Sequence, residues 1–146
     1  MRLVLDTNVA VSGLLWHGNP GQLIDAAQVA LLTLHTSAPL LVELRGVLHR
    51  EKFAKSLAAL GLTATDISEG YAALATVVVP AIIPPTIRDD PYDDAVLACA
   101  VAADADYIIS GDPHLLKLEQ FRNIPIVTPA RAVEKLSIGR DEGNAS

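Results

Sequence analysis

The sequence predicts an α/β domain in which helices flank a mainly parallel central sheet. Short, wholly apolar runs at residues 3–5, 107–109 and 124–127 are typical of strands buried on both faces of a parallel sheet. Segments with apolar residues at helical spacing separate these runs, and such alternation favours parallel pairing. No repeat or linker interrupts the pattern. We therefore expect one domain over residues 1–138, followed by a flexible C-terminal tail at 139–146.

The N-terminal half predicts strands and helices in alternation. The first strand ends at Asp6, and a loop with three glycines separates it from the first helix. Ser37 and Pro39 are typical residues at the start of a helix. The expected elements are a strand at 3–5, a helix over 23–30, a strand at 32–36, a helix after Ser37 that carries apolar residues 40–48, and helices at 53–60 and 66–76.

The C-terminal half predicts the remaining strands and the longest helical pattern. Residues 77–79 should form a third strand, but Pro80 argues against a continuous central strand because proline cannot donate to the ladder. A helix begins at Asp93 or Asp94, where acidic side chains interact favourably with the helix dipole. The other expected elements are a strand at 107–109, a short helix through 115–118, a strand at 124–127 and a final helix from Thr128 to Leu136.

Length and composition exclude several classes of protein. A chain of 146 residues with 51% apolar and 19% charged residues is neither disordered nor fibrous. A single cysteine, Cys99, excludes an intramolecular disulfide and a cysteine-based zinc site, and the net charge of −6 argues against a globally basic nucleic-acid-binding protein. The longest apolar runs are shorter than the roughly 18 residues that span a bilayer, and no signal-peptide core precedes Asp6. We expect a cytoplasmic protein without membrane contact.

Carboxylates follow the predicted strands. Asp6 comes directly after the first strand, and Asp112 follows the strand at 107–109. Ligand sites in open α/β sheets form at the carboxyl ends of strands, and helices that begin there reach the same edge. We therefore expect an acidic cluster of Asp6, Glu43, Asp94 and Asp112, with Asn8, Thr7, Ser12 and Ser110 as neighbours that orient ligands or bound water.

Such a cluster indicates a bound metal ion. Four like charges in one cleft repel one another and raise their own pKa values unless a cation neutralises them. Oxygen ligands suit Mg²⁺ or Mn²⁺ better than Zn²⁺. Bound divalent ions can activate water and stabilise the attacking and leaving oxygens of phosphodiester hydrolysis. The histidines show no metal-ligand spacing; they are His17, His35, His49 and His114.

Several segments, taken in chain order, resemble the PIN domain family, and within it the toxin component of bacterial and archaeal toxin–antitoxin systems. The segments are LVLDTNV at 3–9, LLVEL at 40–44 with VL at 47–48 and REKF at 50–53, DPYDD at 90–94, and ADYIISGD at 105–112 followed by HLL at 114–116. The resemblance extends from Leu3 to about Leu136 and implies a single PIN-like domain. The stretch at 81–86 departs from the family's pattern and blurs the spacing to the third acid.

This resemblance implies a magnesium-dependent ribonuclease with its acidic cluster at Asp6, Glu43, Asp94 and Asp112, and with Asn8 and Asp93 close by. We favour Asp94 over Asp93 because Asp94 precedes the apolar pair at 96–97 at the family's usual interval. The resemblance also implies an RNA substrate, a homodimer, a cognate antitoxin that covers the site, and inhibition of growth when the antitoxin is lost.

Other interpretations compete with this one. A haloacid dehalogenase-like phosphatase would use Asp6 as its nucleophile, but Asn8 stands where that family needs a second aspartate. A PIN-like module that binds RNA or protein without cleavage is a further alternative, although an intact acid set argues against it. Each aspartate could instead cap a helix or turn, and Glu43 could lie on a solvated helix face. Trp16 is compatible with base stacking or with packing, and the basic residues between positions 45 and 55 favour a solvated face over RNA contact.

Overall fold

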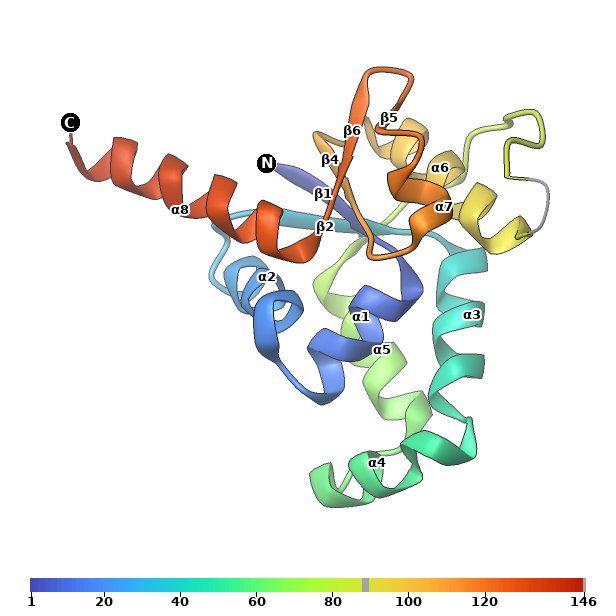
Figure 1. Ribbon diagram of the computed structural model, residues 1–146. Coiled ribbons are helices and arrows are strands. Elements are labelled where there is room, and N and C mark those ends of the chain that lie inside the picture. The colour runs from blue at the N-terminus through green and yellow to red at the C-terminus, as the bar shows by residue number, and fades with distance from the viewer. Residues whose placement is uncertain (88–89, 146) are drawn as a thin grey trace.

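A six-stranded sheet forms the centre of the molecule (Figure 1). The computed structural model describes residues 1–87 and 90–145, with side chains as far as Ser137. The strands lie in the order β3-β2-β1-β4-β6-β5, and every pair is parallel except β5 with β6. This arrangement confirms the predicted α/β fold. The strands are β1 (Arg2–Leu5), β2 (Thr33–Thr36), β3 (Thr76–Val77), β4 (Tyr107–Ile109), β5 (Gln120–Phe121) and β6 (Ile124–Val127).

Helices cover both faces of the sheet (Figure 1). They are α1 (Thr7–Leu15), α2 (Gly18–Gln28), α3 (Ala38–Leu48), the 3-10 helix η1 (Glu51–Phe53), α4 (Ala54–Leu60), α5 (Ala64–Leu74), α6 (Pro91–Ala103), α7 (Pro113–Leu116) and α8 (Pro129–Ala145). Leu3 and Leu5 pack with side chains from α1, α2, α3, α5 and α8. Val4 and Ile108 point the other way and pack with α6 and α7. Because both faces are buried, residues 3–5 of β1 and 108–109 of β4 are all apolar.

The carboxyl ends of β1 and β4 lie side by side. Leu5 is in register with Ile109, and the Asp6 amide donates to the Ile109 carbonyl over 3.0 Å. The residues that follow the two strands therefore enter the same edge of the sheet, as the sequence predicts.

Helix α1 begins directly after β1, where we expected a loop with three glycines. The Asp6 side chain accepts a hydrogen bond from the Val9 amide and so caps the helix. Gly13 lies inside this helix, against α2. A Cβ atom at this position would lie 2.7 Å from Ile24 Cδ1 and 2.9 Å from the Pro20 carbonyl carbon. The glycine thus allows two helices to approach closely and does not mark a turn.

Three further elements differ from the expectation. β3 ends at Val77, and the Val78 amide still donates to the Thr36 carbonyl at the sheet edge. β5 was not predicted, because its hairpin uses Arg122 and Asn123, both with positive φ, in place of the usual glycine turn. Helix α8 continues to Ala145, past the expected end at Leu136. Ser146 lies outside the described residues.

None of the helices in the described parts of the chain is both long and apolar enough to cross a membrane.

Candidate functional site

A pocket at the carboxyl edge of the sheet collects the acidic side chains, and we refer to it as the acid pocket. Its residues come from the ends of β1 and β4, from the starts of α1, α6 and α7, and from the middle of α3. None of the described residues that line it carries a positive charge. They are Asp6, Thr7, Asn8, Glu43, Asp90, Tyr92, Asp93, Val96 and Asp112.

Asp6 is the most firmly held of these acids. It is 5% exposed, its Oδ1 accepts from the Val9 amide over 2.9 Å, and its Oδ2 accepts from the Ser110 hydroxyl. Burial raises the pKa of Asp6, the hydrogen bonds from Ser110 and Val9 oppose this shift, and the charge of Asp112 adds to it. Because both carboxylate oxygens have protein donors, the orientation of Asp6 is set before any ligand arrives.

Ser110 connects Asp6 to Asp112. Its buried hydroxyl donates to Asp6 and accepts from the Asp112 amide over 2.9 Å. The Asp112 carboxylate in turn caps α7 by accepting from the His114 amide over 2.8 Å. The sequence placed Ser110 near the cluster, and the structure gives it this bridging position.

Glu43 reaches the acid pocket from the second turn of α3. It is half-buried, and among the described residues its Oε2 has no hydrogen-bond partner. Burial raises the pKa of Glu43, the Thr7 hydroxyl opposes this, the charges of Asp90 and Asp6 add to it, and Arg50 opposes it. A partly buried carboxylate oxygen without a donor is suited to an incoming cation.

Asp93, and not Asp94, completes the group. Asp93 is 6% exposed, and its Oδ2 is buried without a hydrogen-bond partner among the described residues. Burial and the charges of the neighbouring Asp112, Asp90 and Asp6 together raise the pKa of Asp93 to about 7. A neutralising cation would relieve this cost.

Asp94 faces the loop before α6, so the expectation that it joins the cluster is wrong. Its Oδ1 accepts from the Ile87 amide over 2.8 Å, and both of its oxygens accept from the Thr86 amide over 3.2 Å. The tertiary contacts of α6 account for the difference. Asp93 lines the acid pocket together with Val96 of the next turn, whereas the loop before α6 supplies the amides that hold the Asp94 carboxylate.

Two lining residues were not predicted as part of the site. Asp90 caps α6 by accepting from the Tyr92 amide over 3.0 Å and also lines the acid pocket. Tyr92 lines the pocket as well and is 54% exposed. The pairing of Asp with Pro at positions 90 and 91 is a typical helix start, and this signal could have found Asp90.

His114 lies beside two of the acids, although the histidines show no metal-ligand spacing in the sequence. One donor atom each of Asp93, Asp112 and His114 lies within 4.8 Å of the others. The His114 Nδ1 is 3.8 Å from the Asp112 Oδ1. The sequence signal is only the spacing of two residues between Asp112 and His114 across a proline, which by itself is weak.

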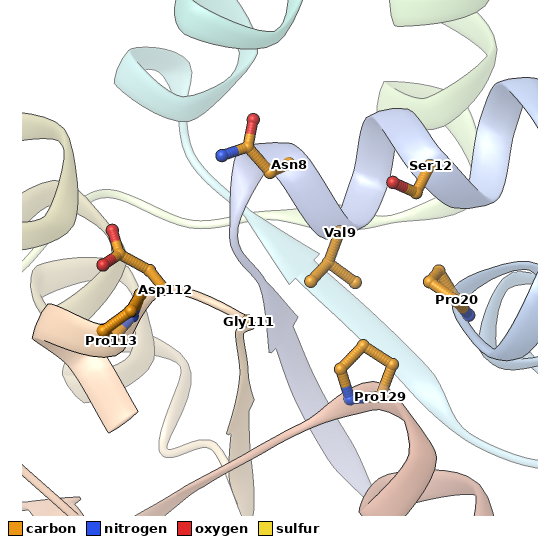
Figure 2. Close-up of a pocket in the computed structure, with 8 residues that line it drawn as sticks. All are labelled: Asn8, Val9, Ser12, Pro20, Gly111, Asp112, Pro113 and Pro129. Carbon is orange, nitrogen blue, oxygen red and sulfur yellow. The ribbon is translucent and has the colours of Figure 1, made fainter. Parts of the chain in front are cut away.

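A second cavity, of about 450 Å³, adjoins the acid pocket, and we refer to it as the side cavity (Figure 2). Asn8 and Asp112 line both hollows. Figure 2 shows Asp112 and Pro113 on one side and Ser12 and Pro20 on the other, with Val9 between them. Three of the residues predicted to lie near the acidic cluster are distributed over the two hollows. Thr7 lines the acid pocket, Ser12 lines the side cavity and Asn8 lines both.

Trp16 and Cys99 have packing contacts. The Trp16 indole nitrogen donates to the Ser56 hydroxyl over 3.0 Å, and its ring lies 5.5 Å from that of Phe53. Trp16 thereby joins the end of α1 to η1 and α4. Cys99 is a fully buried free thiol in α6.

Comparisons with known proteins agree with this architecture. A family model described as PIN domain matches residues 2–114. A chain in the crystal structure of VapBC2 from Rickettsia felis, bound to a DNA fragment from their promoter, superposes with a TM-score of 0.55 at 15% sequence identity. The alignment covers 88% of this chain and 98% of that one. A search of curated protein sequences finds no match.

Proposed function

Because the chain belongs to the PIN domain family, as the match over residues 2–114 shows, we propose that it is a Mg²⁺- or Mn²⁺-dependent endoribonuclease. It would hydrolyse RNA phosphodiester bonds at the acid pocket. The observation that carries this proposal is the pair of carboxylate oxygens, Glu43 Oε2 and Asp93 Oδ2, that are buried without a hydrogen-bond donor among the described residues. They belong to a pocket that also holds Asp6 and Asp112.

The donor set fits a hard divalent cation. The residues that would hold the ion are Asp6, Glu43, Asp93 and Asp112, and carboxylate oxygens are the ligands that Mg²⁺ and Mn²⁺ favour. A bound ion supplies an activated water and stabilises the charge that develops on the phosphate. A phosphodiester would be repelled by these acids in the absence of a cation.

The protein residues orient the reacting groups. Asp6, held by Ser110 and Val9, provides a carboxylate that does not reorganise when substrate binds. The exposed Asn8 offers an amide donor to a phosphate oxygen between the acid pocket and the side cavity. The side cavity has room for the nucleotide on one side of the scissile phosphate. We infer that the RNA strand passes from one hollow to the other at Asn8 and Asp112.

The same contacts argue against a phosphatase that uses Asp6 as a covalent nucleophile. Both oxygens of Asp6 accept hydrogen bonds from the protein, which lowers their nucleophilicity. The position two residues later is Asn8, which cannot serve as a second acid.

We further propose that this ribonuclease is the toxin of a toxin–antitoxin pair. The structural likeness to a chain of VapBC2 supports a protein partner, since that structure is of a complex. On this proposal a cognate antitoxin covers the acid pocket, the chain forms a homodimer, and it acts on RNA in the cytoplasm.

The first experiment is cleavage of total RNA and of an end-labelled structured RNA by the purified protein with Mg²⁺, Mn²⁺ or EDTA. Wild type should cleave only with a divalent ion. The variants Asp6→Asn and Asp93→Asn should lose more than about 100-fold in rate, since changes to residues that only support a metal ligand already cost about 10- to 100-fold. Asp25→Asn is the matched control, because Asp25 is an exposed residue of α2 that pairs with His17 and does not line the acid pocket.

Two results would contradict this proposal. Equal cleavage by wild type and both variants would indicate a contaminating nuclease. RNA binding without cleavage under every metal condition would favour a non-catalytic RNA-binding module.

A further inference from the structure

His114 is an imidazole at the rim of an otherwise all-oxygen site. It lies in the first turn of α7, two residues after Asp112, and its side chain is 62% exposed. The distance of 3.8 Å between His114 Nδ1 and Asp112 Oδ1 is too long for a hydrogen bond. Within the described parts of the chain, neither ring nitrogen has a hydrogen-bond partner. The imidazole is therefore free to bind a ligand.

We propose that His114, Asp93 and Asp112 form a mixed nitrogen–oxygen metal site at this rim, and that it takes a divalent transition-metal ion such as Mn²⁺ in preference to Mg²⁺. This inference rests on the metal dependence in the proposed function and adds the identity of the preferred ion.

The spacing of the three donors suits one ion. Their donor atoms lie within 4.8 Å of one another. Two ligands of an octahedral ion with bonds of about 2.1 Å lie about 3 to 4 Å apart, so small side-chain rotations are sufficient. His114 can make such a rotation because it is exposed and uncommitted.

A second observation points to a ligand at the same place. Asp93 Oδ2 is buried without a hydrogen-bond partner among the described residues, and Asp93 is 6% exposed. No described group of the protein donates a hydrogen bond to this oxygen, so a cation between Asp93 and Asp112 would satisfy it. Within this group of three residues, His114 supplies the nitrogen ligand.

The His114 imidazole favours a transition-metal ion over Mg²⁺. Mg²⁺ binds oxygen ligands almost exclusively and retains several waters, whereas transition-metal ions accept imidazole nitrogen readily. Replacing one oxygen position of the site by His114 should therefore strengthen the binding of Mn²⁺ relative to Mg²⁺.

The test is a titration of the purified full-length protein with Mn²⁺ alone and Mg²⁺ alone, at pH 8, where free imidazole side chains are neutral. Bound Mn²⁺ is followed by electron paramagnetic resonance, with pulsed detection of coupling to ¹⁴N. Wild type should show the ¹⁴N coupling, and His114→Ala should lose it together with about tenfold of the Mn²⁺-over-Mg²⁺ preference. His49→Ala, whose imidazole bonds to the Arg45 carbonyl of its own helix, should keep both.

A third variant, His114→Asp, removes the nitrogen ligand but keeps a metal ligand at the same position. His114→Asp should bind both ions without ¹⁴N coupling and should shift the preference toward Mg²⁺. The inference is overturned if wild type binds Mn²⁺ without ¹⁴N coupling, if His114→Ala keeps the coupling, or if no Mn²⁺ binds. These readouts need no RNA, so a protein that binds Mn²⁺ through His114 but cleaves nothing would overturn the proposed ribonuclease and leave the metal site standing.

Discussion

Asp93 carries an electrostatic cost that only a cation or a proton can relieve. Its carboxyl group is buried, one of its oxygens lacks a donor among the described residues, and Asp112, Asp90 and Asp6 lie around it. These causes raise its pKa from the usual 3.8 to about 7. Proton and metal ion therefore compete for the same side chain.

This pKa predicts how the metal-free protein responds to pH. Between pH 3.8 and about 7, folded Asp93 keeps a proton that the unfolded chain releases, so the free energy of unfolding falls as pH rises through this window. In EDTA, wild type should have a higher Tm at pH 5 than at pH 8. Asp93→Asn, which cannot ionise, should lose this part of the pH dependence and exceed wild type at pH 8. Thermal unfolding across the range measures both, with Asp25→Asn as the control.

The prediction fails if Asp93→Asn and wild type show the same slope of Tm against pH. A parallel slope would mean that the Asp93 carboxylate is already neutralised in EDTA, for example by a cation that the chelator does not remove.

Most residues of the acid pocket could be predicted from the sequence, and the residues that could not have physical reasons for it. Asp6 follows its apolar strand directly and Asp112 follows its strand after two residues, so their place at one edge depends mainly on parallel pairing. The sequence does not separate Asp93 from Asp94, because buried apolar residues follow both at helical spacing, and the tertiary contact of Asp94 with the loop before α6 makes the difference. His114 was missed because its approach to Asp93 depends on how α6 and α7 pack, which local spacing does not encode.

At the scale of elements, close packing of α1 against α2 holds the start of α1, and with it Thr7 and Asn8, at the acid pocket. Gly13 permits this approach, and the sequence alone suggested a loop because glycine is common in loops. Trp16 extends the packing of α1 to η1 and α4. The loop before α6 depends in the same way on a tertiary contact, since Asp94 accepts from the amides of Thr86 and Ile87. Helix propensity predicts neither contact.

Gly13→Ala should destabilise the fold although alanine favours helices. Its Cβ would lie 2.7 Å from Ile24 Cδ1 and 2.9 Å from the Pro20 backbone, and overpacking of this kind costs about 1 to 3 kcal/mol. Gly70→Ala in α5 is the matched substitution, because a Cβ there meets no atom within 4 Å. It should stabilise by about 0.5 to 1 kcal/mol. Urea unfolding measures the change in the free energy of unfolding for each variant, which should be negative for Gly13→Ala and positive for Gly70→Ala. A stabilised Gly13→Ala would show that α1 and α2 can move apart.

At the scale of the whole molecule, the acid pocket joins segments that are distant in the chain. Asp6 follows β1, Glu43 lies on α3, Asp93 lies in the first turn of α6 and Asp112 caps α7. These elements contact opposite faces of the sheet, because α3 packs largely with one core cluster and α6 and α7 with the other. A cation held by all four carboxylates would therefore link the two halves of the core at the sheet edge.

This linkage predicts that metal binding stabilises the fold globally. A ligand that binds only the folded state at 100 times its Kd adds about 2.7 kcal/mol to the free energy of unfolding. Mn²⁺ should therefore raise the Tm of wild type in proportion to the logarithm of its concentration, and EDTA should reverse the rise. Amide hydrogen exchange should slow together in the second turn of α3 and in the first turns of α6 and α7, because one ion restrains all three. Asp93→Asn should lose both effects, whereas protection confined to α7 would indicate an ion held by Asp112 and His114 alone, without the rest of the pocket.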